Sequence, residues 1–277
     1  MHNREPFFRE RPELTSQQRS PNHSTPALDK PYRGRVRDLQ LPDDSAASPK
    51  RNTPIPVVNS MNGIYLELSR RNTMRGLLLF LAIFPFIWMF FAIPFLLIRK
   101  PDLSYFLMDI PCFLMALWIT ALTVRIDIST PSDEPIRFNR LRRNVYVNSF
   151  HHIWWKPWSR WHVTTKVYPW QHLRAEVWSQ RDATGQGGLI FTWGVSIAVV
   201  KPGTNQVIDR FPLSVGQDEG GSWDYVRAYM QHGPDALPPV ETFNDPDEVP
   251  PYNLALRLAP KVRWPAQMDA ESRSGPG

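Results

Sequence analysis

The chain has 277 residues, a formal net charge of +6 and a negative mean hydropathy, so its apolar residues are gathered into a few segments. Its single cysteine, Cys112, excludes an intramolecular disulfide framework and fits a reducing compartment. The length leaves room for one or two domains.

The first segment, residues 1–56, is rich in proline and in charged side chains, with a basic excess and few aromatic residues. Such a segment cannot bury enough apolar area to offset the entropy lost when it becomes ordered. We therefore expect a disordered tail, and its basic excess suits a position near anionic lipid.

Segment 57–75 precedes the apolar part of the chain and allows two structures. Five apolar residues recur at three- and four-residue steps, which favours an amphipathic helix lying at a membrane interface. They are Val57, Met61, Ile64, Tyr65 and Leu68. Residues Tyr65–Leu68 also fit a strand that joins the downstream domain. Both structures stay open at this point.

Residues 76–124 contain two long apolar stretches. Residues 76–98 carry no charge, and residues 103–124 carry only Asp109. A helix needs about 20 residues to cross the hydrocarbon core of a bilayer, so each stretch is long enough. The short link, residues 99–102, forces the two helices to run antiparallel, which predicts a transmembrane hairpin.

The distribution of Lys and Arg predicts how this hairpin is oriented. Basic residues near membrane ends favour the cytoplasmic side. They are more numerous before and after the hairpin than in its turn, so we expect a multi-pass protein of a bacterial inner (cell) membrane with both termini in the cytoplasm. The residues counted are Arg70, Arg71 and Arg75 before the hairpin, Arg99 and Lys100 in the turn, and Arg125, Arg137, Arg140, Arg142 and Arg143 after it.

Asp109 is the one intramembrane acid, and such acids are candidates for function. It lies near the start of its helix, where it could reach interfacial water or pair with Arg99 or Lys100. We favour this role at the helix end over an ion path, because few other polar residues accompany it. Prolines at positions 85, 94 and 111 predict kinks.

Residues 125–240 change to short alternating runs separated by turn residues, which predicts antiparallel strands followed by one helix. We therefore expect an α+β membrane protein, in which the hairpin is followed by a small antiparallel β domain with a terminal helix. The expected elements are a hairpin over residues 136–147 with its turn at 139–144, a strand over 173–179, a hairpin of 189–200 with 207–215, and a helix over 223–231.

The order of these pieces resembles bacterial PH-like domains that follow paired membrane helices. The pieces that carry the resemblance are the basic hairpin Arg137–Val147, the segment Tyr168-Pro169-Trp170 and the helix Trp223–Gln231. The resemblance implies a partly open barrel over which the helix packs. It brings no catalytic motif with it.

A second resemblance is carried by the run Phe138–Val147 behind a two-helix anchor and by the ending Gly233–Pro238. These segments are similar to an uncharacterised family of bacterial membrane proteins. Members are often encoded beside type VI secretion and Rhs-type toxin genes. The resemblance implies a role in toxin immunity or in handling secretion cargo, with a toxin or a secretion component as the protein partner.

The usual signatures of enzyme chemistry are missing from the sequence. His151, His152, His162 and His172 match no common zinc spacing. The glycines at 185–188 lack the Lys-Ser/Thr of a phosphate loop, and no G-x-S-x-G elbow presents a nucleophile. We therefore expect a non-enzymatic protein with no cofactor and no metal site.

The segment from residue 154 to 161 alternates tryptophans with cations and is the candidate binding site. Trp favours the headgroup region, and basic residues are attracted to an anionic leaflet. The competing interpretation is that these rings form domain core or barrel rim with Arg stacked on them. The predicted membrane-interface residues are Arg140, Arg142, Arg143, Trp154, Trp155, Lys156, Trp158, Arg160 and Trp161.

Three functions compete on this evidence. The first is a membrane-anchored protein that presents its cytoplasmic domain to a protein partner. The second is a PH-like module that responds to anionic lipid, and the third is a small channel or transporter subunit built from oligomerised hairpins. Homo-oligomers are compatible with each, nucleic acid is not expected as a partner, and residues 241–277 are expected to be mostly disordered.

Overall fold

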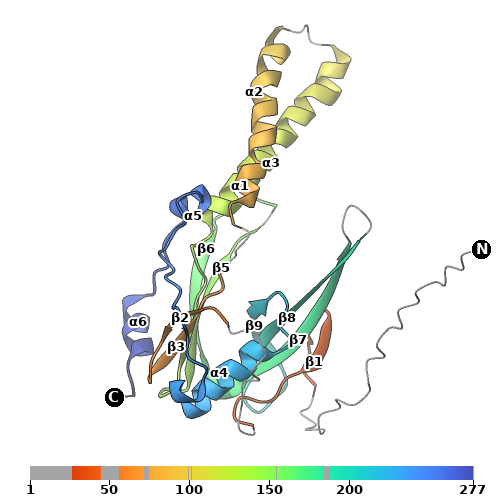
Figure 1. Cartoon of the computed structure of the whole chain (residues 1–277). Coiled ribbons are helices and arrows are strands. Elements are labelled where there is room, and N and C mark those ends of the chain that lie inside the picture. The colour runs from red at the N-terminus through yellow and green to blue at the C-terminus, as the bar shows by residue number, and fades with distance from the viewer. Residues whose placement is uncertain are drawn as a thin grey trace, which may run out of the picture.

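The computed structural model describes residues 27–44, 56–71, 75–98, 100, 102–153, 155–183 and 188–276. The protein is α+β, and its described part consists of a helical hairpin that projects from a domain of two antiparallel sheets (Figure 1). The expected fold class is confirmed at this level.

The hairpin has two apolar arms. One contains α1 (Leu77–Leu81) and α2 (Ile83–Ile98), and the other contains the π-helix η1 (Tyr105–Asp109) and α3 (Ile110–Ser129). Within them, residues 77–95 and 105–129 are long and apolar enough to cross a membrane. Most of their large apolar side chains are exposed, as lipid-facing side chains would be.

Two of the three prolines coincide with irregularities in these helices. Pro85 has no N–H to donate to the carbonyl of Leu81, and α1 ends at Leu81. Pro111 lies at the start of α3, directly after the π-helical turn, which is a common way to absorb a missing helical hydrogen bond. Pro94 lies within α2 without ending it.

The five-stranded sheet takes its strands from both sides of the hairpin. Strand β3 precedes the hairpin and pairs with β4, which follows it, in the register Leu68 with Ile136 and Tyr65 with Asn139. The helical interpretation of the juxtamembrane segment is therefore wrong, because its backbone groups bond to neighbouring strands. The sheet order is β2 (Val58–Met61), β3 (Tyr65–Leu68), β4 (Ile136–Asn139), β5 (Asn144–His151) and β6 (His162–Pro169).

The four-stranded sheet includes a strand from the N-terminal segment. Strand β1 pairs with β7 through Arg37 and Val177, so the expected disorder of residues 1–56 is wrong for residues 27–44. This segment is ordered by the pairing of its backbone with β7, and amino-acid composition gives no information about such pairing. The order is β1 (Arg35–Asp38), β7 (Leu173–Ala183), β8 (Leu189–Val200) and β9 (Val207–Val215), with the short helix η2 (Trp170–His172) before β7.

Helix α4 (Gly221–His232) packs against β4 of one sheet and β9 of the other, at the end of the domain away from the hairpin (Figure 1). It buries Trp223 and Tyr229 in the core between the sheets, and the Trp223 ring lies 5.1 Å from that of Trp170. The helix expected over residues 223–231 is therefore confirmed, and it begins two residues earlier.

The C-terminal segment is ordered, contrary to expectation. It contains η3 (Pro234–Ala236), α5 (Leu254–Leu258) and α6 (Ala266–Arg273). Helix α6 is held on the five-stranded sheet by polar contacts, among them Arg137 to Asp269 at 2.9 Å and Tyr146 to Glu271 at 2.8 Å. Disorder was predicted because the segment is poor in apolar residues, and composition does not reveal polar contacts of this kind. The expected domain limits, 125 and 240, are therefore too narrow at both ends.

Candidate functional site

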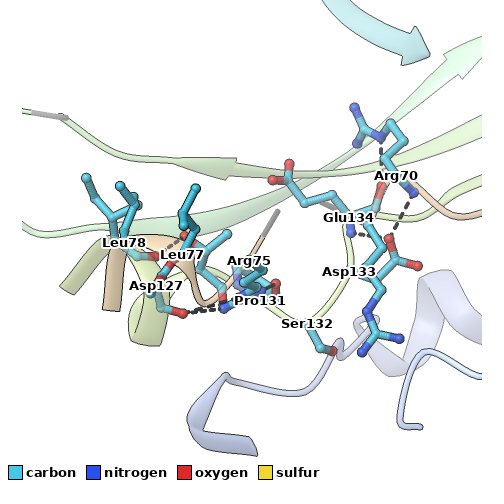
Figure 2. Close-up of a pocket in the computed structure, with 12 residues that line it drawn as sticks. Arg70, Arg75, Leu77, Leu78, Asp127, Pro131, Ser132, Asp133 and Glu134 are labelled. Atoms are coloured by element: carbon cyan, nitrogen blue, oxygen red, sulfur yellow. Dashed lines mark hydrogen bonds between the residues drawn. The ribbon is translucent and has the colours of Figure 1, made fainter. Parts of the chain in front are cut away.

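A cavity of about 240 Å³ lies where the hairpin meets the β domain (Figure 2). Its wall is formed by the chain entering α1 and by the chain leaving α3. Arginines and acidic residues line it in equal number: Arg70, Arg71, Arg75, Asp127, Asp133 and Glu134.

Arg75 precedes the first helical arm and caps the end of the second. Its guanidinium donates to the backbone carbonyl of Asp127 at 2.8 and 3.2 Å, and also to the carbonyls of Thr130 and Pro131. The last carbonyls of a helix have no partner within the helix, and a cation at this end also interacts favourably with the helix dipole. Arg75 thus stabilises the C-terminus of α3.

Asp127 provides the reciprocal contact. Its Oδ2 accepts a hydrogen bond of 2.7 Å from the N–H of Leu79, in the first turn of α1. Acidic side chains are stabilising at helix N-termini for the converse reason. Because Arg75 and Asp127 are both buried, each arm of the hairpin caps the other at its base.

The C-terminal segment closes the same junction from outside. Asn253 donates from Nδ2 to the carbonyl of Arg75 at 2.9 Å, and its Oδ1 caps α5 by accepting from the N–H of Leu256 at 3.1 Å. The N–H of Ser132 donates to the carbonyl of Pro260 at 2.9 Å. The base of the hairpin is therefore bound to the domain on two sides.

Arg70 connects the junction to both sheets. Its Nε donates to the carbonyl of Glu134 at 2.7 Å, and its two terminal nitrogens donate to the carbonyls of Asn148 in β5 and Pro212 in β9. Its backbone N–H donates to Asp133 at 2.9 Å. Burial lowers the pKa of Arg70, and the carboxylates of Glu134 and Asp133 oppose that shift.

This arrangement is suited to mechanical coupling. The donors of Arg70 and Arg75 point at backbone carbonyls, so these side chains fix the position of the hairpin on the domain. Sequence reasoning used both arginines only for membrane orientation and missed Asp127. The available signal was an acid in the last turn of α3, a helix whose only other charged residue is Arg125.

The tryptophan loop, residues 152–161 between β5 and β6, is exposed over most of its length. Trp155 is 50 % and Trp158 73 % exposed, and Lys156 Nζ lies 4.5 Å from the centre of the Trp155 ring. Arg160 is exposed as well, and Trp154 lies outside the described residues. The alternative that these rings form domain core does not hold for Trp155 and Trp158.

The loop is held beside the hairpin through Arg125 of α3. Its guanidinium donates to the carbonyl of Ser159 at 2.9 Å and lies 4.7 Å from the centre of the Trp161 ring. Trp161, in turn, packs edge to face on Phe150 and on His152. The rim interpretation, with Arg stacked on a ring, is therefore correct for Trp161, while Trp155 and Trp158 stay open to contact.

The structure does not bring Arg140, Arg142 and Arg143 together with this loop. They lie in the β4–β5 turn, at the end of the sheet away from the hairpin. Arg142 donates to the carbonyl of Gly275 at 2.7 Å, and Arg143 pairs with Asp43. They were included in the predicted interface because they lie near the loop in sequence. In space, the length of the β4–β5 strand pair separates them from the loop.

Asp109 lies where η1 meets α3, near the turn of the hairpin, and is half-buried. This places it toward the opposite end of the arms from the β domain. Of its two expected partners, Arg99 lies outside the described residues.

The profile of a family of unknown function, DUF6708, matches residues 113–276, which is more than half of the chain. The match extends from within α3 to the end of the C-terminal segment and so includes Asp127, the tryptophan loop and α6. No curated protein and no solved structure matches the chain.

Proposed function

This chain belongs to DUF6708, a family of unknown function, and we propose that it is a non-enzymatic inner-membrane protein whose hairpin presents the β domain to a protein partner in the cytoplasm. The observation that carries the proposal is the pairing of β3 with β4 across the hairpin. A hairpin whose two flanks form one sheet must have both flanks on the same side of the membrane.

The side of the membrane follows from charge. Arg70, Arg71 and Arg75 lie before the first arm and Arg125 lies near the end of the second, whereas the turn carries fewer basic residues. By the positive-inside rule, the domain faces the cytoplasm and the turn faces the periplasm. The strand pairing requires both flanks of the hairpin to lie on the same side of the membrane, and the charge distribution favours the cytoplasm as that side.

The sheet edges support a protein partner. Among the described residues, β6 pairs only with β5 and β9 only with β8, so each strand has a free edge. They approach each other through Lys166 and Tyr168, which contact Asp209, but they form no ladder. This arrangement supports our proposal of a partly open, PH-like barrel with α4 packed over it, and a free edge can bind an extended segment of another protein.

The resemblance to the uncharacterised family of bacterial membrane proteins indicates the class of the partner. By that resemblance, the proposed partner is a type VI secretion component or a toxin, and the proposed role is that of an accessory or an immunity factor. A hairpin clamped to its domain suits such a role, because it holds the binding surface at a fixed place on the membrane.

Site-specific photo-crosslinking in cells tests the proposal. A photoreactive amino acid in place of Val163 or Val167, which are exposed on β6, should give one protein adduct. The same group in place of Tyr252, which is 87 % exposed in the segment before α5, should not give that adduct. Recovery of lipid adducts alone from the β6 positions would contradict a protein partner at this edge.

A second function, sensing of anionic lipid, is favoured by the position of the tryptophan loop. Arg125 fixes the loop to the end of α3, so a hairpin in the membrane would hold Trp155 and Trp158 near the headgroups. Tryptophan prefers that region, and Lys156 and Arg160 would add attraction of about 1 kcal/mol each near an anionic leaflet.

Hydrogen exchange of the full chain in nanodiscs tests this second function. Amides of residues 155–161 should exchange more slowly in phosphatidylglycerol than in phosphatidylcholine, and added salt should reduce the difference. Equal exchange in both lipids would remove the lipid-sensing role. The full chain is needed because a fragment that begins after α3 would lack β1, β2 and β3.

A further inference from the structure

Strands β7 and β8 continue past the rest of their sheet. Strand β1 pairs with β7 only as far as Trp178, and β9 pairs with β8 only from Gly194 onward. One further backbone hydrogen bond lies on each side, from the N–H of Ser179 to the carbonyl of Gly34 and from the N–H of Gly216 to the carbonyl of Trp193. Beyond these, among the described residues, 180–183 pair with 189–192 alone, and we name this part the β7–β8 ribbon. A two-stranded ribbon is at best marginally stable in water without a surface to pack on.

The end of the ribbon exposes apolar side chains on both faces. Leu189 is 66 %, Ile190 52 % and Phe191 38 % exposed. Successive side chains of a strand point to opposite faces, so Ile190 lies on one face, beside its cross-strand partner Asp182, and its two neighbours lie on the other. Phe191 stacks on Trp193, at 6.0 Å between ring centres. A flat partner surface could cover only one of these faces.

The ribbon rises toward the same side of the domain as the hairpin (Figure 1). The tryptophan loop, which belongs to the other sheet, also lies on this side, where Arg125 holds it. The Arg181 guanidinium lies 5.4 Å from the centre of the Phe191 ring, in a position to extend past an apolar surface toward headgroups. Asp182 follows it, so the described ribbon carries no net charge.

We propose that the end of the β7–β8 ribbon is a second membrane contact, which places Leu189, Ile190 and Phe191 at the boundary between headgroups and acyl chains of the leaflet that the hairpin enters. The proposal rests on the anchoring proposed above. Lipid is the partner proposed for this contact, because lipid surrounds an inserted ribbon and so covers both of its faces, which a flat protein surface cannot do. The contact is apolar and neutral, so it differs from the basic tryptophan loop in being insensitive to salt.

Lipid quenching of site-specific labels in the full chain tests this contact. In a Cys112→Ala background, single cysteines at Phe90, Ile190 and Ile208 are labelled with an environment-sensitive fluorophore. The protein is reconstituted into vesicles of phosphatidylethanolamine and phosphatidylglycerol with or without spin-labelled lipid. Phe90 reports the hairpin. Ile208 is the matched control, because it is an apolar side chain, 61 % exposed, at the far end of β9 from the ribbon.

The expected result is loss of fluorescence at positions 90 and 190, at low and high salt alike, with position 208 unaffected by lipid and quenched by aqueous iodide. Quenching by lipid at 90 but not at 190 would overturn the ribbon contact and leave the anchor in place. Absence of lipid quenching at 90 would overturn both. Equal lipid quenching at 190 and 208 would also overturn the ribbon contact, because contact would then not be confined to it. Leu189→Cys provides a second ribbon position.

Discussion

At the scale of single residues, Arg137 shows how a charge is held in the interior of this domain. It is 1 % exposed and donates to Glu67 at 2.7 Å and to Asp269 at 2.9 Å. Its guanidinium lies between the rings of Tyr65 and Trp264, at 5.1 and 4.8 Å from their centres. It therefore joins the five-stranded sheet to the C-terminal segment.

Replacing Arg137 by Met should destabilise the protein strongly, because Glu67 would stay buried without its partner. Breaking a buried pair in this way costs about 3–5 kcal/mol. In a domain of this size that lowers the thermal unfolding midpoint by about 6–20 °C. Near-ultraviolet circular dichroism of the solubilised full chain would measure it. The double variant Arg137→Met with Glu67→Leu should recover most of the loss, and a double variant as unstable as the single one would contradict the argument.

At the scale of elements, β6 and β9 meet through the stacking of Tyr168 on Phe211 and through one carboxylate, that of Asp209, on which their polar contact depends. Burial raises the pKa of Asp209, but hydrogen bonds from Lys166 and Tyr168 more than offset this, so its pKa lies below the ordinary 3.8. The pKa of Tyr168 is raised, first by burial and then by its hydrogen bond to Asp209. A carboxyl with a depressed folded-state pKa stabilises the protein above its unfolded pKa.

The stability contributed by Asp209 should therefore be full above about pH 5 and fall as the pH drops through and below 3.8. An Asp209→Asn variant should be less stable than the wild type at neutral pH and show a weaker loss on acidification. Unfolding midpoints measured across this range would check it. Asp245→Asn, in an exposed loop, serves as the control, and an Asp209→Asn profile parallel to that of the wild type would refute the assignment.

Helix α5 is short, so its order should depend on Asn253. Asn253→Ala removes both the cap and the bond to Arg75, and we expect faster hydrogen exchange in residues 254–258. Loss of such a cap costs about 1 kcal/mol. Asn253→Asp separates the two contacts, because a carboxylate still caps α5 but cannot donate to the carbonyl of Arg75. It should keep α5 protected while exchange at the base of the hairpin increases, and unchanged exchange at the base would show that this bond is not needed.

The elements that were predicted from sequence are those whose signal is local. The hairpin of 189–200 with 207–215 has its predicted bounds, since alternating apolar residues on either side of a Pro-Gly turn specify it. Strand β1 and helix α6 were missed because their partners lie far away in sequence. Glu176 accepts a hydrogen bond from the backbone N–H of Tyr32, and Arg137 donates to Asp269.

The candidate site was predictable only in part for the same reason. Exposure of Trp155 and Trp158 agrees with the loop expected from their spacing, whereas the mutual capping of the hairpin by Arg75 and Asp127 requires knowledge of where both arms begin and end. A charged residue beside an apolar stretch has the same local pattern whether it faces headgroups or caps the neighbouring helix.

At the scale of the whole molecule, the sheet that joins both flanks of the hairpin makes a strict topological demand. Because Leu68 pairs with Ile136, the strands before and after the hairpin cannot lie on opposite sides of a membrane. The only cysteine, Cys112, can be replaced by alanine, so single cysteines can be placed at Lys100 in the hairpin turn and at Thr204 in the β8–β9 turn.

A membrane-impermeant maleimide should label Lys100→Cys in intact spheroplasts, and it should label Thr204→Cys only after the membrane is permeabilised. Thr204 is exposed in the folded protein, so burial would not explain its protection before permeabilisation. Labelling of Thr204→Cys but not Lys100→Cys in intact cells would invert the orientation and keep the hairpin. Labelling of both positions before permeabilisation would mean that the chain does not cross the membrane, and the domain would then have to reach its partner without a transmembrane anchor.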